Sequence, residues 1–234
     1  MRVQVLWTNE AVRGRDLAGS AAAVVDCLRA TTTVVTAIAN GAKDIVPVAT
    51  VEEARAFDPA YLRAGEQQIV PIPGFDFGNS PLAVTREAVA GRGIVLVTTN
   101  GSKAVRWTAD AGAGPVVAFA LVNVTATAAR LAAAERLCIV CSGTRGEFAL
   151  DDACCAGALV ERLAARVGER ALELDDAAQA ARMVYRAGGA AVVPMSRAAD
   201  HLRAAGYDDD LAYCVREDIL QAVPEWDGTA LRGL

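Results

Sequence analysis

The chain has 234 residues, of which 53% are apolar and 5% aromatic, with 23 basic against 28 acidic residues and a net charge of −5. This composition can bury a sizeable core and excludes an intrinsically disordered chain. The negative charge argues against a nucleic-acid-binding protein, and no apolar run reaches the roughly 18 residues of a membrane span. Because residues 1–10 also lack the pattern of a signal peptide, we expect a cytoplasmic protein with neither a nucleic-acid nor a membrane partner.

Apolar runs of strand length alternate with helical patterns along most of the chain. Strands are expected over residues 3–7, 21–26, 44–48, 61–65, 94–98, 116–120 and 137–141. Helices are expected over residues 31–40, 51–57, 80–90, 102–111, 125–135 and 151–167. This alternation, with nearly continuous apolar strands, predicts an α/β fold with a mostly parallel sheet flanked by helices.

The last quarter of the chain lacks apolar runs of strand length. We expect it to be helical to its end, most clearly over residues 175–186 and 208–218. The interpretation is a single domain over residues 1–234, in which the part from about residue 168 forms a helical C-terminal layer or a small subdomain.

Two features that could carry chemistry have a simpler structural interpretation. Cys138 and Cys141 form a C-x-x-C pattern inside an expected strand. Because side chains alternate along a strand, these two thiols face opposite sides and cannot share a metal or a disulfide. We expect them to be buried and inert. The single histidine, His201, lies in an expected helix and is interpreted as a surface or structural residue.

Polar residues gather where the expected strands end. Ligands of open α/β sheets bind at the carboxyl ends of the strands, so these residues predict one site built from several loops. The strand ends in question are Asp26 to Thr33, Gly65–Glu66, Thr98 to Ser102, Asn123 and Ser142 to Arg145.

The chemistry of these residues favours a phosphate ester. Residues 31–33 and 100–102 precede or begin helices, where free N–H groups either form ordinary N-caps or bind an anion. Arg29 nearby favours the anion. Asp26 leaves a buried strand and needs Arg29 or a metal as a partner. Acids from separate loops, Asp26 and Glu66, are what a Mg²⁺ site uses, and phosphate, Mg²⁺ and one aspartate together suit phosphoryl transfer. The chain has neither a P-loop nor a G-x-G-x-x-G motif, which argues against a nucleotide kinase or a dinucleotide enzyme.

Several motifs in register resemble the 2-phosphosulfolactate phosphatase family. They are DCLRATTT (26–33), GFDFGNSP (74–81), TTNGS (98–102), SGT (142–144) and FALDD (148–152), with CAG (155–157) and a weaker likeness at Asp210–Leu211. The resemblance implies a Mg²⁺-dependent phosphatase with an α/β fold of its own. Such an enzyme releases phosphate from 2-phosphosulfolactate and leaves 3-sulfolactate, a step on one route to coenzyme M.

The resemblance also assigns roles. Asp26 and Arg29 are the expected catalytic residues, with Asp26 acting either as nucleophile or as metal ligand. The expected phosphate and substrate ligands are Thr31, Thr32, Thr33, Asn79, Ser80, Asn100, Gly101, Ser102 and Arg145, of which Asn79, Ser80 and Arg145 hold the sulfonate or carboxylate end. The expected Mg²⁺ ligands are Asp26, Glu66, Asp151 and Asp152, with Asp76 in reserve.

The chain departs from the family pattern in three places. Gln67 replaces an Arg, Asp151 replaces a Glu, and Ser102 replaces a Thr with its hydroxyl retained. The Arg lost at residue 67 removes one possible contact to an anionic substrate, so it affects the identity of the substrate more than the type of reaction. The alternatives are a phosphatase for another small phosphorylated hydroxy acid and a non-catalytic anion-binding protein. We also expect a homo-oligomer, with a dimer as the default.

Overall fold

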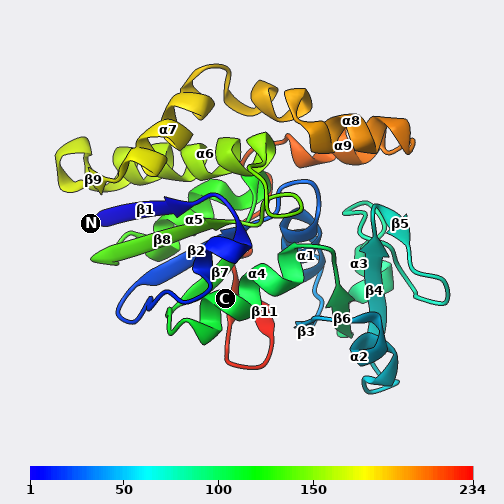
Figure 1. Ribbon diagram of the computed structural model, residues 1–234. Coiled ribbons are helices and arrows are strands. Elements are labelled where there is room, and N and C mark those ends of the chain that lie inside the picture. Colours follow the sequence, from blue (N-terminus) through cyan, green and yellow to red (C-terminus); the bar gives the residue numbers. More distant parts are fainter. Residues whose placement is uncertain (234) are drawn as a thin grey trace.

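Eleven strands form one mixed sheet across residues 1–233, the residues that the computed structural model describes (Figure 1). The strands are β1 (Arg2–Leu6), β2 (Ala21–Val25), β3 (Asp44–Val48), β4 (Leu62–Gln67), β5 (Val70–Pro71), β6 (Gly93–Val97), β7 (Val116–Phe119), β8 (Arg136–Cys141), β9 (Glu173–Leu174), β10 (Pro224–Trp226) and β11 (Leu231–Gly233). Their order in the sheet is β5-β4-β6-β3-β11-β10-β7-β2-β8-β1-β9.

Most of this sheet is parallel, as predicted, and its parallel strands fall into two groups. One group contains β7, β2, β8, β1 and β9, and the other contains β3, β6 and β4. Between them lies the hairpin of β10 and β11, which is antiparallel to β7 on one side and to β3 on the other. Three successive antiparallel pairs therefore separate the two parallel groups in the sheet.

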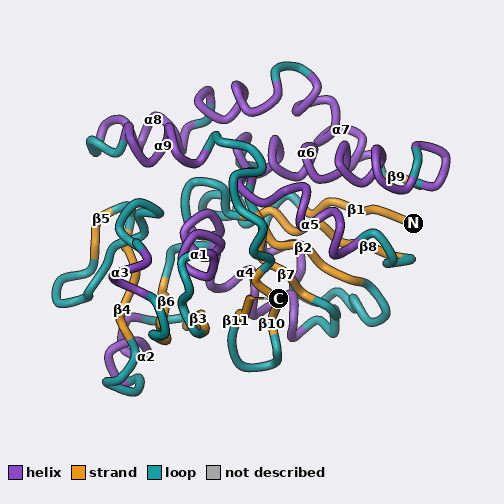
Figure 2. The backbone as a smooth tube through the Cα atoms, turned by 180° about the vertical axis from the view of Figure 1, so that it is seen from behind, coloured by secondary structure: helices purple, strands orange, loops and turns teal. Residues whose placement is uncertain are grey.

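Helices cover both faces of the sheet (Figure 2). They are α1 (Ala30–Ala39), α2 (Val51–Ala56), α3 (Arg86–Val89), α4 (Gly101–Asp110), α5 (Val124–Leu131), α6 (Leu150–Val167), α7 (Asp176–Arg186), α8 (Arg197–Ala204) and α9 (Asp208–Cys214). Short 3₁₀ helices occur at Asn9–Val12, Leu121–Asn123, Glu169–Ala171 and Gly189–Met195.

The core explains how the two strand groups are held together. One apolar cluster packs α5, α6 and α7 against the β1, β2, β7 and β8 strands. A second cluster lies on the opposite face and contains side chains of α1 and α4 together with residues of both strand groups, including Val24 of β2 and Leu96 of β6. Because α1 follows β2 and α4 follows β6, this shared cluster brings the beginnings of two helices from different strand groups to one place.

Two sequence predictions about secondary structure were wrong. The helix expected over residues 80–90 is confined to α3, because residues 80–83 form a turn in which the Ala83 amide donates to the Ser80 carbonyl. The chain end expected to be helical forms the β10–β11 hairpin instead. Its turn is fixed by Asp227, whose Oδ1 accepts from the backbone amides of Thr229 and Ala230.

The cysteines follow the prediction. Cys138 and Cys141 of β8 point into the two different core clusters, and all six thiols are free and buried.

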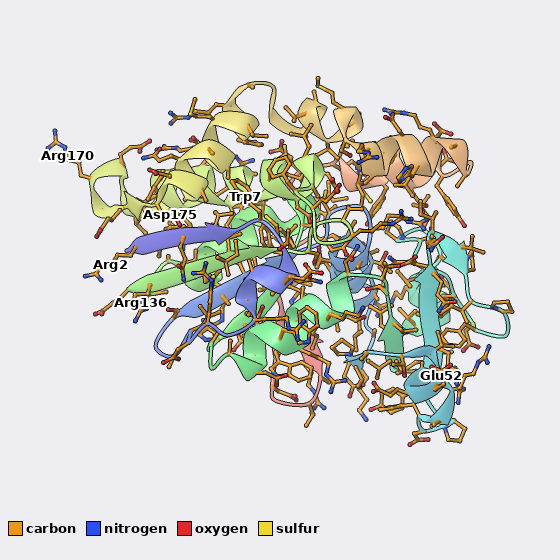
Figure 3. All side chains as sticks on the ribbon, viewed as in Figure 1. Arg2, Trp7, Glu52, Arg136, Arg170 and Asp175 are labelled. Atoms are coloured by element: carbon orange, nitrogen blue, oxygen red, sulfur yellow. The ribbon has the colours of Figure 1, made fainter. Side chains whose placement is uncertain are left out.

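Charged side chains mostly point away from the sheet, as Arg2, Arg136 and Arg170 do at one end of the molecule (Figure 3). Within residues 1–233, no helix combines the length and the apolar character needed to cross a lipid bilayer. The buried charged groups are therefore the exceptions that need a reason.

Candidate active site

A cavity of about 640 Å³ opens where the loops after β2, β4, β6 and β8 meet α8 and the segment that leads from it to α9. Six of the residues expected in the site line it: Asp26, Arg29, Glu66, Asn79, Asn100 and Arg145. They come from both strand groups, so the cavity lies where the carboxyl ends of the two groups converge. The expected site residue Asn123 lies elsewhere, because its amide is bonded to the Ala120 N–H and the Ala222 carbonyl.

Asp26 stands at the first turn of two helices. Its Oδ1 accepts from the backbone amide of Ala30 in α1 at 3.3 Å. Gly101, the first residue of α4, lies so close that a Cβ added there would be 3.0 Å from Oδ2 of Asp26. Burial, with smaller contributions from the charges of Asp151 and Glu66, raises the pKa of Asp26 to about 7, against the opposing effect of the N–H groups of Ala30 and Gly101.

Arg29 is the buried cation of the cavity. Its Nη1 lies 2.5 Å from Oδ2 of Asp210, and both side chains are almost fully buried. The guanidinium carbon lies 4.2 Å from the centroid of the Tyr207 ring, a cation–π contact. The peptide bond between Leu28 and Arg29 is cis.

Glu66 ties the turn after β4 to the loop after β6. Its Oε1 accepts from both the amide and the hydroxyl of Thr99 at 2.9 Å, and its Oε2 accepts from the amide of Ile69 at 2.7 Å. A carboxylate that bridges two loops in this way fixes the wall of the cavity.

Asp151 and Asp152 begin α6 and are buried behind the cavity. Both oxygens of Asp152 accept backbone amides, from Cys27 at 2.8 Å and from Gly143 at 2.9 Å, so this side chain fastens the loops after β2 and β8 together. Burial raises the pKa of Asp151 to about 6. Burial, followed by the charges of Asp151 and Asp26, raises the pKa of Asp152 well above its usual range.

The acids suit a hard cation, although residues 1–233 contain no ready-made group of three or more His, Cys, Asp or Glu side chains that could hold a metal. Mg²⁺ needs only one or two carboxylates when water and a substrate phosphate complete its shell. Asp26 and Asp151 are the pair that could supply them. The charge of Asp151 raises the pKa of Asp26, and Oδ1 of Asp151 is buried without a hydrogen-bond partner among the described residues. Asp76 lies apart from them and accepts the Arg63 amide at 2.8 Å.

The expected hydroxyl ligands are engaged within the protein. Thr31, Thr32 and Thr33 donate to the backbone carbonyls of residues 26, 27 and 79, and Ser102 donates to the carbonyl of Leu96. Ser80 donates to Oδ1 of Asp210 at 2.7 Å. None of these five residues is among those that line the cavity. Their hydroxyls hold the loops that carry the lining residues.

Sequence reasoning missed the opposite wall. It is formed by residues of the β4–β5 turn and of α8 and its continuation, namely Gln68, Ile69, Val70, Pro71, Ala198, His201, Leu202, Ala204, Ala205 and Tyr207. His201 does lie on the surface of a helix, as expected, but that surface faces the cavity. The likeness at Asp210–Leu211 begins three residues beyond Tyr207 and was a sequence signal close to this wall.

The arrangement suits binding of a phosphate ester. Helix N-termini and a guanidinium stabilise anions, whereas the buried carboxylates beside them would repel an anion unless a cation or a proton intervenes. A site for simple anion binding has no use for such acids. The geometry is therefore that of a site which handles an anion and a charge-balancing group together.

Comparison with known proteins gives consistent results. The sequence profile described as 2-phosphosulpholactate phosphatase matches residues 6–229. A protein of Symbiobacterium thermophilum is 39% identical over 218 residues, covering 89% of this chain and 92% of the relative. Relatives in Caldanaerobacter subterraneus subsp. tengcongensis (36% identity, 96% and 95% coverage) and Clostridium acetobutylicum (31%, 97% and 97%) span nearly the whole length of both chains. All three bear the name "probable 2-phosphosulfolactate phosphatase".

Proposed function

The chain belongs to the 2-phosphosulfolactate phosphatase family, and on that premise we propose that it hydrolyses 2-phosphosulfolactate to 3-sulfolactate and phosphate in a Mg²⁺-dependent reaction. The observation that carries the proposal is the carboxylate of Asp26, half-buried at the first turns of α1 and α4 in a cavity that also presents the Arg29 guanidinium. An anion donor set and buried acids at one point are what phosphoryl transfer requires.

The residues of the cavity have different roles in the proposed reaction. Arg29 and the N–H groups at the start of α4 stabilise the charge on the phosphate oxygens. Asn79, whose buried Oδ1 has no partner within residues 1–233, faces the remainder of the ester together with Arg145. Asp26 lies beside the phosphate either as the nucleophile or as a metal ligand, in which case water attacks the phosphate. Glu66 and Asp152, whose oxygens already accept N–H groups, keep the loops in place.

Mg²⁺ would be held by Asp26 and Asp151, with Glu66 and Asp152 adding negative charge nearby. When bound, the ion supplies Lewis-acid stabilisation of the charge that develops on the phosphoryl oxygens. A role on the route to coenzyme M follows for this chain if 2-phosphosulfolactate is its physiological substrate.

The test is release of phosphate from 2-phosphosulfolactate by the purified protein, with Mg²⁺ and again with excess chelator. We expect release with Mg²⁺ and none with chelator. A folded protein that releases no phosphate in either condition contradicts the proposal. Release that is unaffected by the chelator contradicts the metal requirement alone.

A second candidate is a phosphatase for another phosphorylated hydroxy acid. It is favoured by the size of the cavity, about 640 Å³, and by the apolar side chains of Ile69, Val70 and Leu202 in its wall, since cavities of this size bury ligands larger than a three-carbon ester. A panel of phosphorylated hydroxy acids with increasing apolar substituents separates the two. A higher kcat/KM for a larger ester supports the second candidate.

A further inference from the structure

We propose that Asp210, on the C-terminal helix α9, is the positioning residue of the anion site: it orients Arg29 and, through Ser80, the loop that carries Asn79. This inference rests on the proposed function of the cavity. Asp210 does not itself line the cavity, so it acts through these two partners.

The first contact orients the guanidinium. Oδ2 of Asp210 holds Nη1 of Arg29 at 2.5 Å, and the Tyr207 ring packs on the face of the guanidinium at 4.2 Å. Of the three nitrogens of the Arg29 guanidinium, only Nη1 makes a hydrogen bond within residues 1–233. A planar group with five N–H donors, fixed along one edge and one face, presents its remaining donors in a set direction. Arg29 is almost fully buried but is among the residues that line the cavity, so the proposal assigns these donors to a phosphate bound there.

The second contact orients the loop. Oδ1 of Asp210 accepts from the Ser80 hydroxyl at 2.7 Å, and Thr33 donates to the carbonyl of Asn79 at 3.1 Å. Asn79 is therefore held at its own carbonyl and through the residue that follows it. Its side-chain Oδ1 is buried, lacks a partner within residues 1–233 and belongs to a residue of the cavity wall.

These two contacts distinguish positioning from simple charge balance. A counter-ion for Arg29 would need only the first contact, and a longer acid would serve it equally well. Asp210 uses both oxygens on two segments that lie 181 and 130 residues away in sequence, so its length as well as its charge is set by the geometry. Asp210→Glu keeps the charge and moves the carboxylate by one methylene, so it separates the two roles.

The experiment measures binding of inorganic phosphate by calorimetry in the full-length protein. The variants are Asp210→Asn, Asp210→Glu, Arg29→Gln and the double variant Asp210→Asn/Arg29→Gln. We expect each single change to weaken phosphate binding at least tenfold. The double variant should bind more weakly than Arg29→Gln, because Asp210 also acts through Ser80, but by less than the product of the two single effects. Asp209→Asn, an exposed acid on the same helix, is the matched control and should bind as the wild type does.

Three results would overturn the proposal: wild-type affinity in Asp210→Asn or Asp210→Glu, effects that multiply in the double variant, or a wild-type protein that binds no phosphate at millimolar concentrations. If Asp210→Asn does not fold, Ser80→Ala takes its place, and an affinity equal to that of the wild type then counts against the proposal.

A second measurement tests whether Asp210 orients the guanidinium group. Arg29→Ala leaves a space bounded by Asp210 and Tyr207, and we expect millimolar guanidinium to restore phosphate binding in Arg29→Ala but not in Arg29→Ala/Asp210→Asn. Equal rescue in both would contradict the proposal. Because phosphate binding needs no turnover, a failure of the proposed reaction stays distinguishable from a failure of this inference.

Discussion

Gly101 begins α4 directly against the carboxylate of Asp26, although the two residues follow strands of different parallel groups. A Cβ at residue 101 would lie 3.0 Å from Oδ2 of Asp26 and 2.7 Å from the Cβ of Ala30. The close approach of α1 and α4 at this point therefore depends on the missing side chain. It places the N–H groups of two helix ends around a single acid.

Gly101→Ala should separate the two helix ends. We expect a loss of about 1–3 kcal/mol in the free energy of unfolding from overpacking and a fall in kcat of at least tenfold, since a small displacement at a reacting centre is costly. The control is Gly93→Ala, where a Cβ would meet the Tyr61 ring at 2.4 Å, away from the cavity. It should lose stability and keep its kcat. A Gly101→Ala protein with wild-type kcat would show that the contact is irrelevant to the reaction.

Asp26→Asn should abolish turnover in a folded protein. We expect kcat to fall by about a thousandfold or more, as for other residues at the centre of a reaction, because the amide is neither a nucleophile nor an anionic metal ligand. Asp58→Asn is the matched control: its Oδ1 also accepts a backbone amide, from Ala60 at 2.9 Å, but in an exposed turn. Phosphate release at wild-type rates by Asp26→Asn would remove Asp26 from the chemistry.

The same substitution should change how stability depends on pH. Burial raises the pKa of Asp26 from 3.8 to about 7, so between these values the folded protein binds more protons than the unfolded chain, and stability falls as the pH rises. Without added divalent cations, we expect the melting temperature of the wild type to decrease from pH 4 towards pH 7, and the decrease to be smaller in Asp26→Asn. Parallel curves for the two proteins would contradict the raised pKa.

Asp152→Ala should loosen the loops after β2 and β8. It leaves the buried amides of Cys27 and Gly143 without acceptors, which costs roughly 1–3 kcal/mol for each unpaired group, and it should lower kcat because Cys27 adjoins Asp26. Asp227→Ala removes acceptors from two backbone amides in an exposed turn, where water replaces them. Denaturant unfolding should show the larger loss in the free energy of unfolding for Asp152→Ala. Equal losses would show that burial does not increase the contribution of these hydrogen bonds to stability.

The six thiols should be unreactive in the native protein. All six are buried, and burial raises the pKa of Cys138, Cys154 and Cys155 to about 12, so few thiolates form at pH 8. A chromogenic disulfide reagent should modify none of them in the folded protein and all six in denaturant. Rapid modification of a thiol without loss of structure would contradict this expectation.

Much of the fold could be predicted because it follows local patterns. The buried run of β2 ending in Asp26, and the Thr-Thr-Asn-Gly turn into α4, show both a strand and its ligand-binding end in a few adjacent residues. The C-terminal hairpin was missed because its strands have three residues each, too few to establish a period of two, although Asp227–Gly228 is a turn signal typical of hairpins. The expected helix over residues 80–90 is confined to α3 because residues 80–83 form a turn, whose first residue, Ser80, is bonded to Asp210, a partner 130 residues away.

The sequence by itself determined the alternation of strands and helices, the polar strand ends and the family likeness, since these depend on neighbouring residues. Only the tertiary structure decided that the β10–β11 hairpin joins the two parallel groups, that α8 and Tyr207 close the cavity, and that Asp210 holds Arg29. The physical reason is that contacts between distant segments depend on how whole elements pack. The periodicity of apolar residues along the chain does not indicate which elements will be in contact.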